Sequence, residues 1–111
     1  MTTEHTSGPW QLIGSHESEG FDCYWIKAQP SPFLRGFTKE VATVTGPQGG
    51  EAEANARLIA AAPEMLAALR EAREALHFHY VEWDGEPEDA VPLQLARSRC
   101  DAAISKATGA A

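Results

Sequence analysis

The sequence predicts a small α+β domain, with an antiparallel sheet of about three strands in the N-terminal half covered by two or three C-terminal helices. Three observations predict this class. Apolar and polar residues alternate between residues 9 and 46, which is the period of half-buried strands. Ten of the 26 residues over 51–76 are alanine and none is glycine, which favours helices. The segment GPQGG, residues 46–50, separates the two halves.

The N-terminal half is predicted to start with a flexible polar tail, residues 1–8, followed by a β-meander over residues 9–46. WQLIG indicates a first strand, and SHESEG a polar turn. FDCYWIKA is the clearest strand, because its aromatic and β-branched side chains alternate between two faces. The two prolines of QPSPFLRG indicate a loop or an edge, and FTKEVATVTG a third strand. We therefore expect one domain over residues 9–111, since 111 residues bury one modest core.

The C-terminal half is predicted as a broken helical segment over residues 51–80 and a C-terminal helix over residues 91–108 that ends at Gly109. The strongest helical signal, NARLIAAAPEML, contains Pro63. A proline inside a helix costs about 3 kcal/mol, but almost nothing at the first position of a new helix. We expect two helices, over about 51–61 and about 63–80, with a sharp bend between them. A single helix kinked at Pro63 is the alternative.

Charge and composition exclude several classes of protein. The net charge is −7, and residues 51–111 carry eleven acids against six bases. An acidic surface repels phosphates, so direct binding of nucleic acid is disfavoured and a basic protein partner is favoured. We expect a cytoplasmic protein, because no apolar run is long enough to span a membrane and the first residues do not resemble a signal peptide. Cys23 and Cys100 are expected as small apolar residues rather than a disulfide.

No motif for catalysis or metal binding is present, so we expect no enzyme, no cofactor and no metal. GPQGG follows a strand and precedes a helix, but it lacks the spacing of a phosphate-binding loop. No GxSxG motif is present. His77 and His79 are two residues apart, and on a helix they point away from each other. A remnant enzyme that uses either histidine is a further alternative.

The run EWDGEPED, between the predicted helices, is the candidate partner-binding site. A dense acidic loop can imitate phosphates in front of a basic partner, and a tryptophan is favoured at interface centres. A solvated acidic loop is the alternative, in which Trp83 pins the loop to the core. The candidate residues are Glu82, Trp83, Asp84, Glu86, Glu88 and Asp89.

A second functional hypothesis is a small-ligand or nucleotide binder with a pocket between the sheet and the helices. In this hypothesis Arg57, Arg70 or Arg73 meets an anion. The aromatic residues bear on a different question, because they exceed what one face of a three-stranded sheet needs. The excess favours a homodimer that buries part of the sheet. These aromatic residues are Trp10, Phe21, Trp25, Phe33 and Phe37.

The segment EAEANARLIAAAPEMLAALREA closely resembles a segment of small bacteriophage and prophage accessory proteins, usually EANARLIAAAPELLEAL. Those proteins also begin with a PW-type start, as in Gly8-Pro9-Trp10, and end with a helix like ARSRCDAAISKATG. The resemblance implies a phage protein acting in the bacterial host. By analogy with other small acidic phage proteins, it would bind and inhibit a host protein, for example a CRISPR or other anti-phage component. Asn55 and Arg57 would cap the helix pair or tie it to the sheet.

Overall fold

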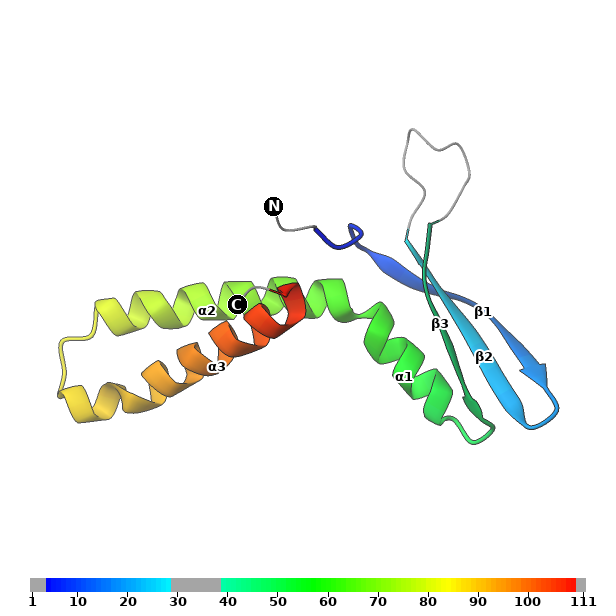
Figure 1. Ribbon diagram of the computed structural model, residues 1–111. Coiled ribbons are helices and arrows are strands. Elements are labelled where there is room, and N and C mark those ends of the chain that lie inside the picture. Colours follow the sequence, from blue (N-terminus) through cyan, green and yellow to red (C-terminus); the bar gives the residue numbers. More distant parts are fainter. Residues whose placement is uncertain (1–3, 29–38, 110–111) are drawn as a thin grey trace. The chain divides into compact units, whose positions relative to one another are not determined.

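The computed structural model describes residues 4–28 and 39–109, and it confirms the predicted α+β class. The described chain contains a three-stranded antiparallel sheet, followed by three α-helices and a short 3-10 helix (Figure 1). It divides into two compact units, which we describe separately. The sheet unit is Thr6–Glu64, and the helical unit is Met65–Ala111 together with Met1–His5.

The sheet has the order β1-β2-β3, with both neighbouring pairs antiparallel. Its strands are β1 (Trp10–Ser18), β2 (Phe21–Ala28) and β3 (Lys39–Pro47). β1 and β2 are joined by a two-residue turn in which Gly20 has a φ of 84°, a conformation that glycine adopts without steric cost. The predicted loop QPSPFLRG, which contains Phe33, lies outside the described residues, as do Phe37 and Thr38 at the start of the predicted third strand.

β1 is longer than the sequence predicts, and the predicted turn SHESEG is therefore wrong in its first four residues. SHES continues the strand, and only the last two residues turn. The register shifts at a bulge between Ile13 and Ser15, where Gly14 has a φ of 76°. Ser15 and His16 are exposed. An edge strand tolerates such polar side chains, so composition alone does not end β1.

α1 (Glu51–Ala60) packs on one face of the sheet through its smallest side chains (Figure 1). Ala52 is 2% exposed and Ala56 is fully buried, as is Ile26 of β2. A Cβ atom on Gly46 of β3 would lie 3.1 Å from the Cβ of Ala52, which is closer than ordinary van der Waals contact. The backbones of α1 and β3 therefore approach each other as closely as a glycine and an alanine permit.

The expected break at Pro63 is confirmed. α1 ends at Ala60, and α2 (Ala62–Val81) begins two residues later, so Pro63 occupies the first turn of α2. There its missing N–H removes no helical hydrogen bond. Gly8 lies directly against the proline ring, since a Cβ on Gly8 would be 2.7 Å from the Cβ of Pro63. The PW-type start and the NARLIAAAPEML segment are thus in contact.

Asn55 and Arg57 do not tie α1 to the sheet. Both are exposed, and the Arg57 guanidinium forms an ion pair with Glu53 one turn earlier in the same helix. An exposed pair of this kind contributes roughly 0.3–0.5 kcal/mol. The contact with the sheet comes instead from Ala52 and Ala56.

The helical unit contains most of α2, the 3-10 helix η1 (Pro87–Ala90) and α3 (Val91–Thr108). α3 matches the predicted boundaries, and Gly109 ends it with a φ of 74°. No residue of α3 is buried, and polar contacts join it to α2. Arg73 Nε donates to Asp101 at 2.7 Å, and the Arg97 guanidinium lies 4.8 Å from the centroid of the Tyr80 ring. Among the described residues, no helix is long and apolar enough to cross a membrane.

The close approach of α1 to β3 generates a stability prediction. Gly46→Val adds a Cβ and two methyl groups where the Ala52 Cβ leaves no room, so we expect it to lower the free energy of unfolding by about 1–3 kcal/mol. Thr45→Val is the matched control, because Thr45 is exposed on the opposite face and should change stability by less than about 0.5 kcal/mol. Urea unfolding followed by circular dichroism measures both values. Equal stabilities of the two variants would contradict the assignment of Gly46 to the interface with α1.

Candidate functional site

The predicted partner-binding residues all lie in one turn, which joins α2 to α3. We call this turn the acidic tip. It is shaped by backbone hydrogen bonds: the Glu82 N–H donates to Phe78 O at 3.1 Å, and the Asp89 N–H donates to Glu86 O at 3.0 Å. Pro87 is the first residue of η1. At that position the missing N–H of proline removes no hydrogen bond. The members of the acidic tip are Glu82, Trp83, Asp84, Glu86, Glu88 and Asp89.

Trp83 holds the acidic tip in shape. Its indole Nε1 donates a hydrogen bond to Glu86 O at 2.8 Å, and the ring covers Gly85, where a Cβ would lie 2.9 Å from Trp83 Cζ2. The side chain nevertheless stays 40% exposed. Trp83 therefore holds the turn by contacts within the turn itself, and part of its ring stays exposed beside the carboxylates. That Trp83 pins the loop to the core stays a prediction.

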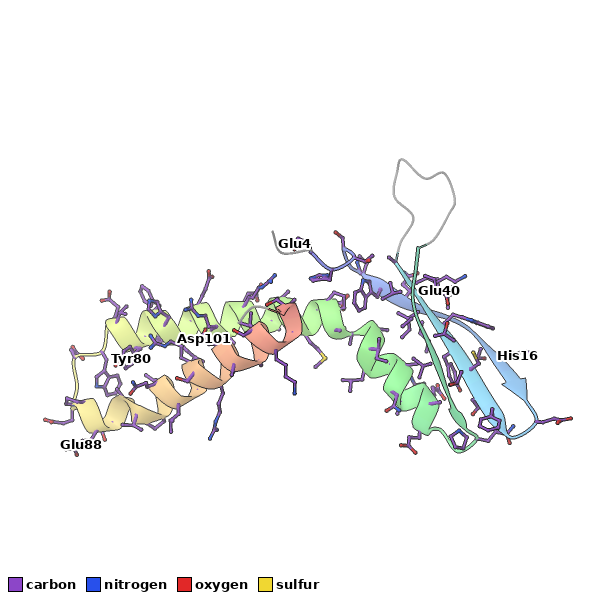
Figure 2. The ribbon with its side chains drawn as sticks, viewed as in Figure 1. Glu4, His16, Glu40, Tyr80, Glu88 and Asp101 are labelled. Atoms are coloured by element: carbon purple, nitrogen blue, oxygen red, sulfur yellow. The ribbon has the colours of Figure 1, made fainter. Side chains whose placement is uncertain are left out.

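The five carboxylates of the acidic tip are solvent exposed. Within residues 4–28 and 39–109, none of them has an ion-pair or side-chain hydrogen-bond partner, whereas Asp101 in the middle of α3 is paired with Arg73. Figure 2 shows Glu88 at the end of the helical hairpin, with its side chain pointing away from it. The negative charge of the tip is therefore available to an outside partner.

A cation that the sequence analysis did not single out joins α3 to α2 outside the acidic tip. Arg97 of α3 reaches α2, where its guanidinium stacks on Tyr80 and its Nη1 lies 2.9 Å from Nδ1 of His77. A guanidinium only donates, so Nδ1 of His77 accepts this hydrogen bond. His79 has only an edge contact with the Phe78 ring. Twenty residues separate His77 and Arg97, so no local pattern in the sequence indicates the pair.

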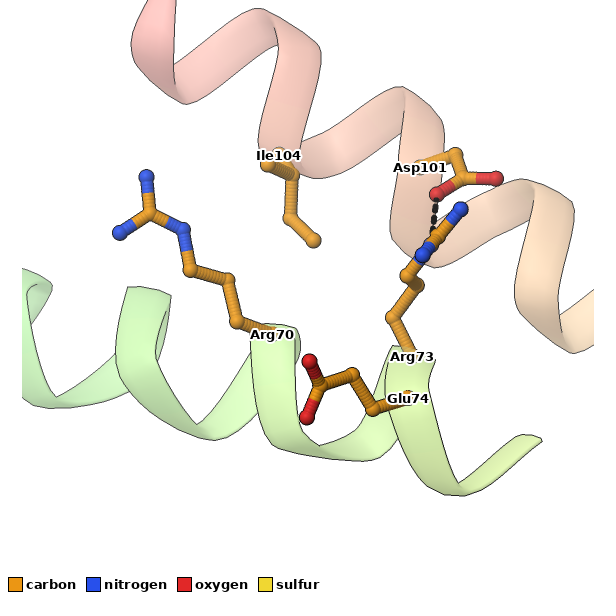
Figure 3. A pocket seen from close by; sticks show the side chains of 5 residues that line it. All are labelled: Arg70, Arg73, Glu74, Asp101 and Ile104. Atoms are coloured by element: carbon orange, nitrogen blue, oxygen red, sulfur yellow. Dashed lines mark hydrogen bonds and ion pairs between the residues drawn. The ribbon is translucent and has the colours of Figure 1, made fainter. Parts of the chain in front are cut away.

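The helical unit also contains an open pocket of about 330 Å³ between α2 and α3 (Figure 3). Two of the three predicted arginines, Arg70 and Arg73, line it, together with Glu74, Asp101 and Ile104. Arg73 is engaged by Asp101 across the pocket. Arg70 is exposed and, among the described residues, has no ion-pair partner. The two arginines and the two acids of the pocket balance in charge. Because Arg73 is already paired with Asp101, Arg70 is the group that an anion would meet.

The third predicted arginine, Arg57, lies on α1 in the sheet unit and pairs there with Glu53. The two cysteines are free and half-buried, Cys23 on β2 and Cys100 on α3. In the part of the chain that the structure describes, no three histidine, cysteine or acidic side chains are gathered to hold a metal ion.

The role of Trp83 generates a second prediction. Trp83→Ala removes the hydrogen bond to Glu86 and the cover over Gly85, so we expect it to lower the free energy of unfolding by about 1–2 kcal/mol. Hydrogen exchange of the Asp89 amide, which closes η1, should accelerate accordingly. Phe78→Ala is the control, since Phe78 is 61% exposed and its ring only edges against His79. Unchanged exchange in Trp83→Ala would show that the turn holds its shape without the indole.

Comparison of the sequence with known proteins shows the family of the chain. No curated protein and no solved structure matches it. The family described as Salmonella phage P22 protein Y8K6 matches over residues 1–111, the full length, and it is a family of phage proteins, as the PW-type start and the NARLIAAAPEML segment predicted. The chain therefore belongs to the family of Salmonella phage P22 protein Y8K6.

Proposed function

We propose that this phage protein is a non-enzymatic binding protein whose acidic tip docks on a basic surface of a host protein and inhibits it. The observation that carries the proposal is the state of the five carboxylates: all are exposed and none has a partner among the described residues. They lie on a turn whose shape is held by the Trp83 indole rather than by a cation.

Electrostatics supports docking by the acidic tip. Five like charges within eight residues repel one another. A basic partner relieves that repulsion and gains charge-assisted hydrogen bonds. The charge also steers the encounter, and such steering raises association rates by about 10–1,000-fold at low salt. Because the turn is held before binding, little entropy is lost when the partner arrives.

The same electrostatics indicates the class of partner. Proteins that bind nucleic acids carry basic grooves that neutralise phosphates, and a row of fixed carboxylates competes for such a groove. A phage gains from blocking host proteins of this kind, which include CRISPR effectors and other nucleic-acid-binding immune components. We therefore propose action in the cytoplasm of the bacterial host, with no direct contact between this acidic chain and nucleic acid.

A second candidate function is the binding of a small anionic ligand such as a nucleotide. It is favoured by one observation, namely that Arg70 is left without an ion-pair partner at the mouth of a pocket which Arg73 also lines. The pocket lies at the lower end of the volume range of small-molecule sites, about 300–1,000 Å³. The ligand would be held chiefly by charge.

Charge reversal tests the first function. A partner is first isolated from infected host cells with the unmodified chain and identified by mass spectrometry. We expect the triple change Glu86→Lys, Glu88→Lys and Asp89→Lys to weaken its affinity by roughly a hundredfold and to lower its association rate. The matched control is Glu4→Lys, Glu19→Lys and Glu71→Lys, three exposed acids outside both the acidic tip and the pocket, with the same change in net charge. Equal loss in both triple variants would refute docking by the acidic tip.

Thermal denaturation with added ATP, ADP or inorganic phosphate tests the second function. A ligand at 100 times its dissociation constant adds about 2.7 kcal/mol to the free energy of unfolding, which raises the melting temperature by several degrees. We expect Arg70→Ala to abolish that rise. Arg99→Ala, which removes an exposed arginine of α3 that does not line the pocket, should retain it. The absence of a shift with all three compounds would count against an anion site.

A further inference from the structure

The sheet has a second face, opposite α1, that carries an uncharged and largely apolar surface. Residues that are opposite each other on two neighbouring strands lie on the same face of the sheet. Ile26 and Gly46 lie on the side of α1, so the alternate residues of each strand lie on the other side. There Trp25 is flanked by Ile13 and Thr43, and Cys23 by His16 and Thr45. We call this surface the open face, formed by Ile13, Phe21, Cys23, Trp25, Thr43 and Thr45.

The open face does not have the composition of a solvated sheet surface. The outer face of an antiparallel sheet is ordinarily polar, yet Phe21 is 60% exposed and Ile13 is 37% exposed. Trp25 covers the bulge of β1, since a Cβ on Gly14 would lie 3.3 Å from Trp25 Cε3. The indole is therefore spread across two strands and forms a broad apolar patch beside Ile13. An exposed cluster of this kind marks an interaction surface.

The charges around the open face restrict what can cover it. None of its six members is formally charged. The charged side chains of the same face, Lys27 and Glu40, are opposite each other in the register of β2 and β3. Thr43 Oγ1 donates a hydrogen bond to Glu40 Oε1 at 2.6 Å, which holds that carboxylate at the border. A strongly basic or acidic partner finds no charge among these six residues and only one lysine and one glutamate beside them, whereas a second copy of the chain brings six residues that are equally uncharged.

The size of the face suits a small symmetric interface. Strands of nine residues at about 3.4 Å per residue, in three rows about 4.8 Å apart, cover roughly 30 by 14 Å. With the relief of the side chains, each copy offers on the order of 600 Å². Two copies together then reach the roughly 1,000 Å² that a specific interface needs.

We propose that the open face is a homodimer interface, in which the sheets of two copies pack face to face about a twofold axis. Each copy then supplies the same residues, as a twofold interface requires. The inner side chains of the two sheets interdigitate over about 10 Å, and Phe21 and Trp25 lose their contact with water. This interface lies on the sheet unit and the acidic tip on the helical unit, so each dimer carries two tips.

Sedimentation equilibrium over a wide range of protein concentration tests the proposal. We expect the unmodified chain to sediment at twice the 12.0 kDa of one chain. Phe21→Glu buries a charge on the central strand of the interface, at the end beside the β1–β2 turn, and it should raise the dimer dissociation constant by roughly a hundredfold. Thr45→Arg is a second variant on a different strand with the same expected effect. Both side chains are exposed in the single chain, so circular dichroism should show an unchanged fold.

Phe78→Glu is the matched control, because Phe78 is as exposed as Phe21 but lies on α2 in the helical unit. We expect it to remain a dimer. A monomeric unmodified chain would overturn the proposal, including the case in which another part of the same chain covers the open face. A dimer that persists in both Phe21→Glu and Thr45→Arg, or one that only Phe78→Glu dissociates, would also overturn it.

Discussion

The close contact between α1 and the sheet is the constraint on which the rest of the sheet unit depends. Ala52 and Ala56 are almost completely buried, and Gly46 leaves room only for a hydrogen atom beside Ala52. A three-stranded sheet is marginal until something covers one face, and here one helix of ten residues supplies the cover. The small alanine side chains allow the backbone of α1 to approach the strands closely, so one short helix covers this face. Larger residues at these positions would lift α1 and expose Ile26, which among the described residues is the one large side chain that is fully buried.

The helical unit is stabilised differently from the sheet unit. In its described part only Leu66 and Ala90 are buried, and the two long helices meet through an ion pair, a stacked guanidinium and a histidine contact. Pairs as exposed as Arg73 and Asp101 contribute little each. Their value is geometric, because they set which faces of α2 and α3 meet. The acidic tip, at the end of this hairpin, is then shaped by its own tryptophan and backbone.

The sequence predicted those features that depend on local periodicity and backbone chemistry. β2, the break at Pro63 and the full extent of α3 follow from alternation, from the missing proline N–H and from Gly109. The acidic tip likewise consists of neighbouring residues, but its role as a binding site stays a prediction. Features that depend on distant residues were not accessible. The polar residues SHES remain in β1 because β2 pairs with them.

Other features of the site were hidden for the same reason. Arg97 meets His77 only after the chain has reversed direction, and Arg57 was assigned to the sheet although its partner is one turn away in α1. Periodicity showed that the sheet carries more aromatic residues than one face needs, but only the register of β1, β2 and β3 shows which of them share the open face. Sequence patterns therefore describe single elements better than contacts between them.

The exposure of the acidic tip has a consequence for how such a phage protein can change over generations. Apart from Trp83, which covers Gly85, the side chains of the acidic tip have no ion-pair or side-chain hydrogen-bond partner in the described fold. Substitutions there leave the contact of Ala52 and Ala56 with the sheet and the polar contacts between α2 and α3 intact. Surface substitutions of this kind usually alter stability by less than about 0.5 kcal/mol. If the tip docks on a host protein as proposed, selection by a changing host target can act on it with little risk of unfolding the protein. The fold separates a segment that is free to diversify from a scaffold that is not.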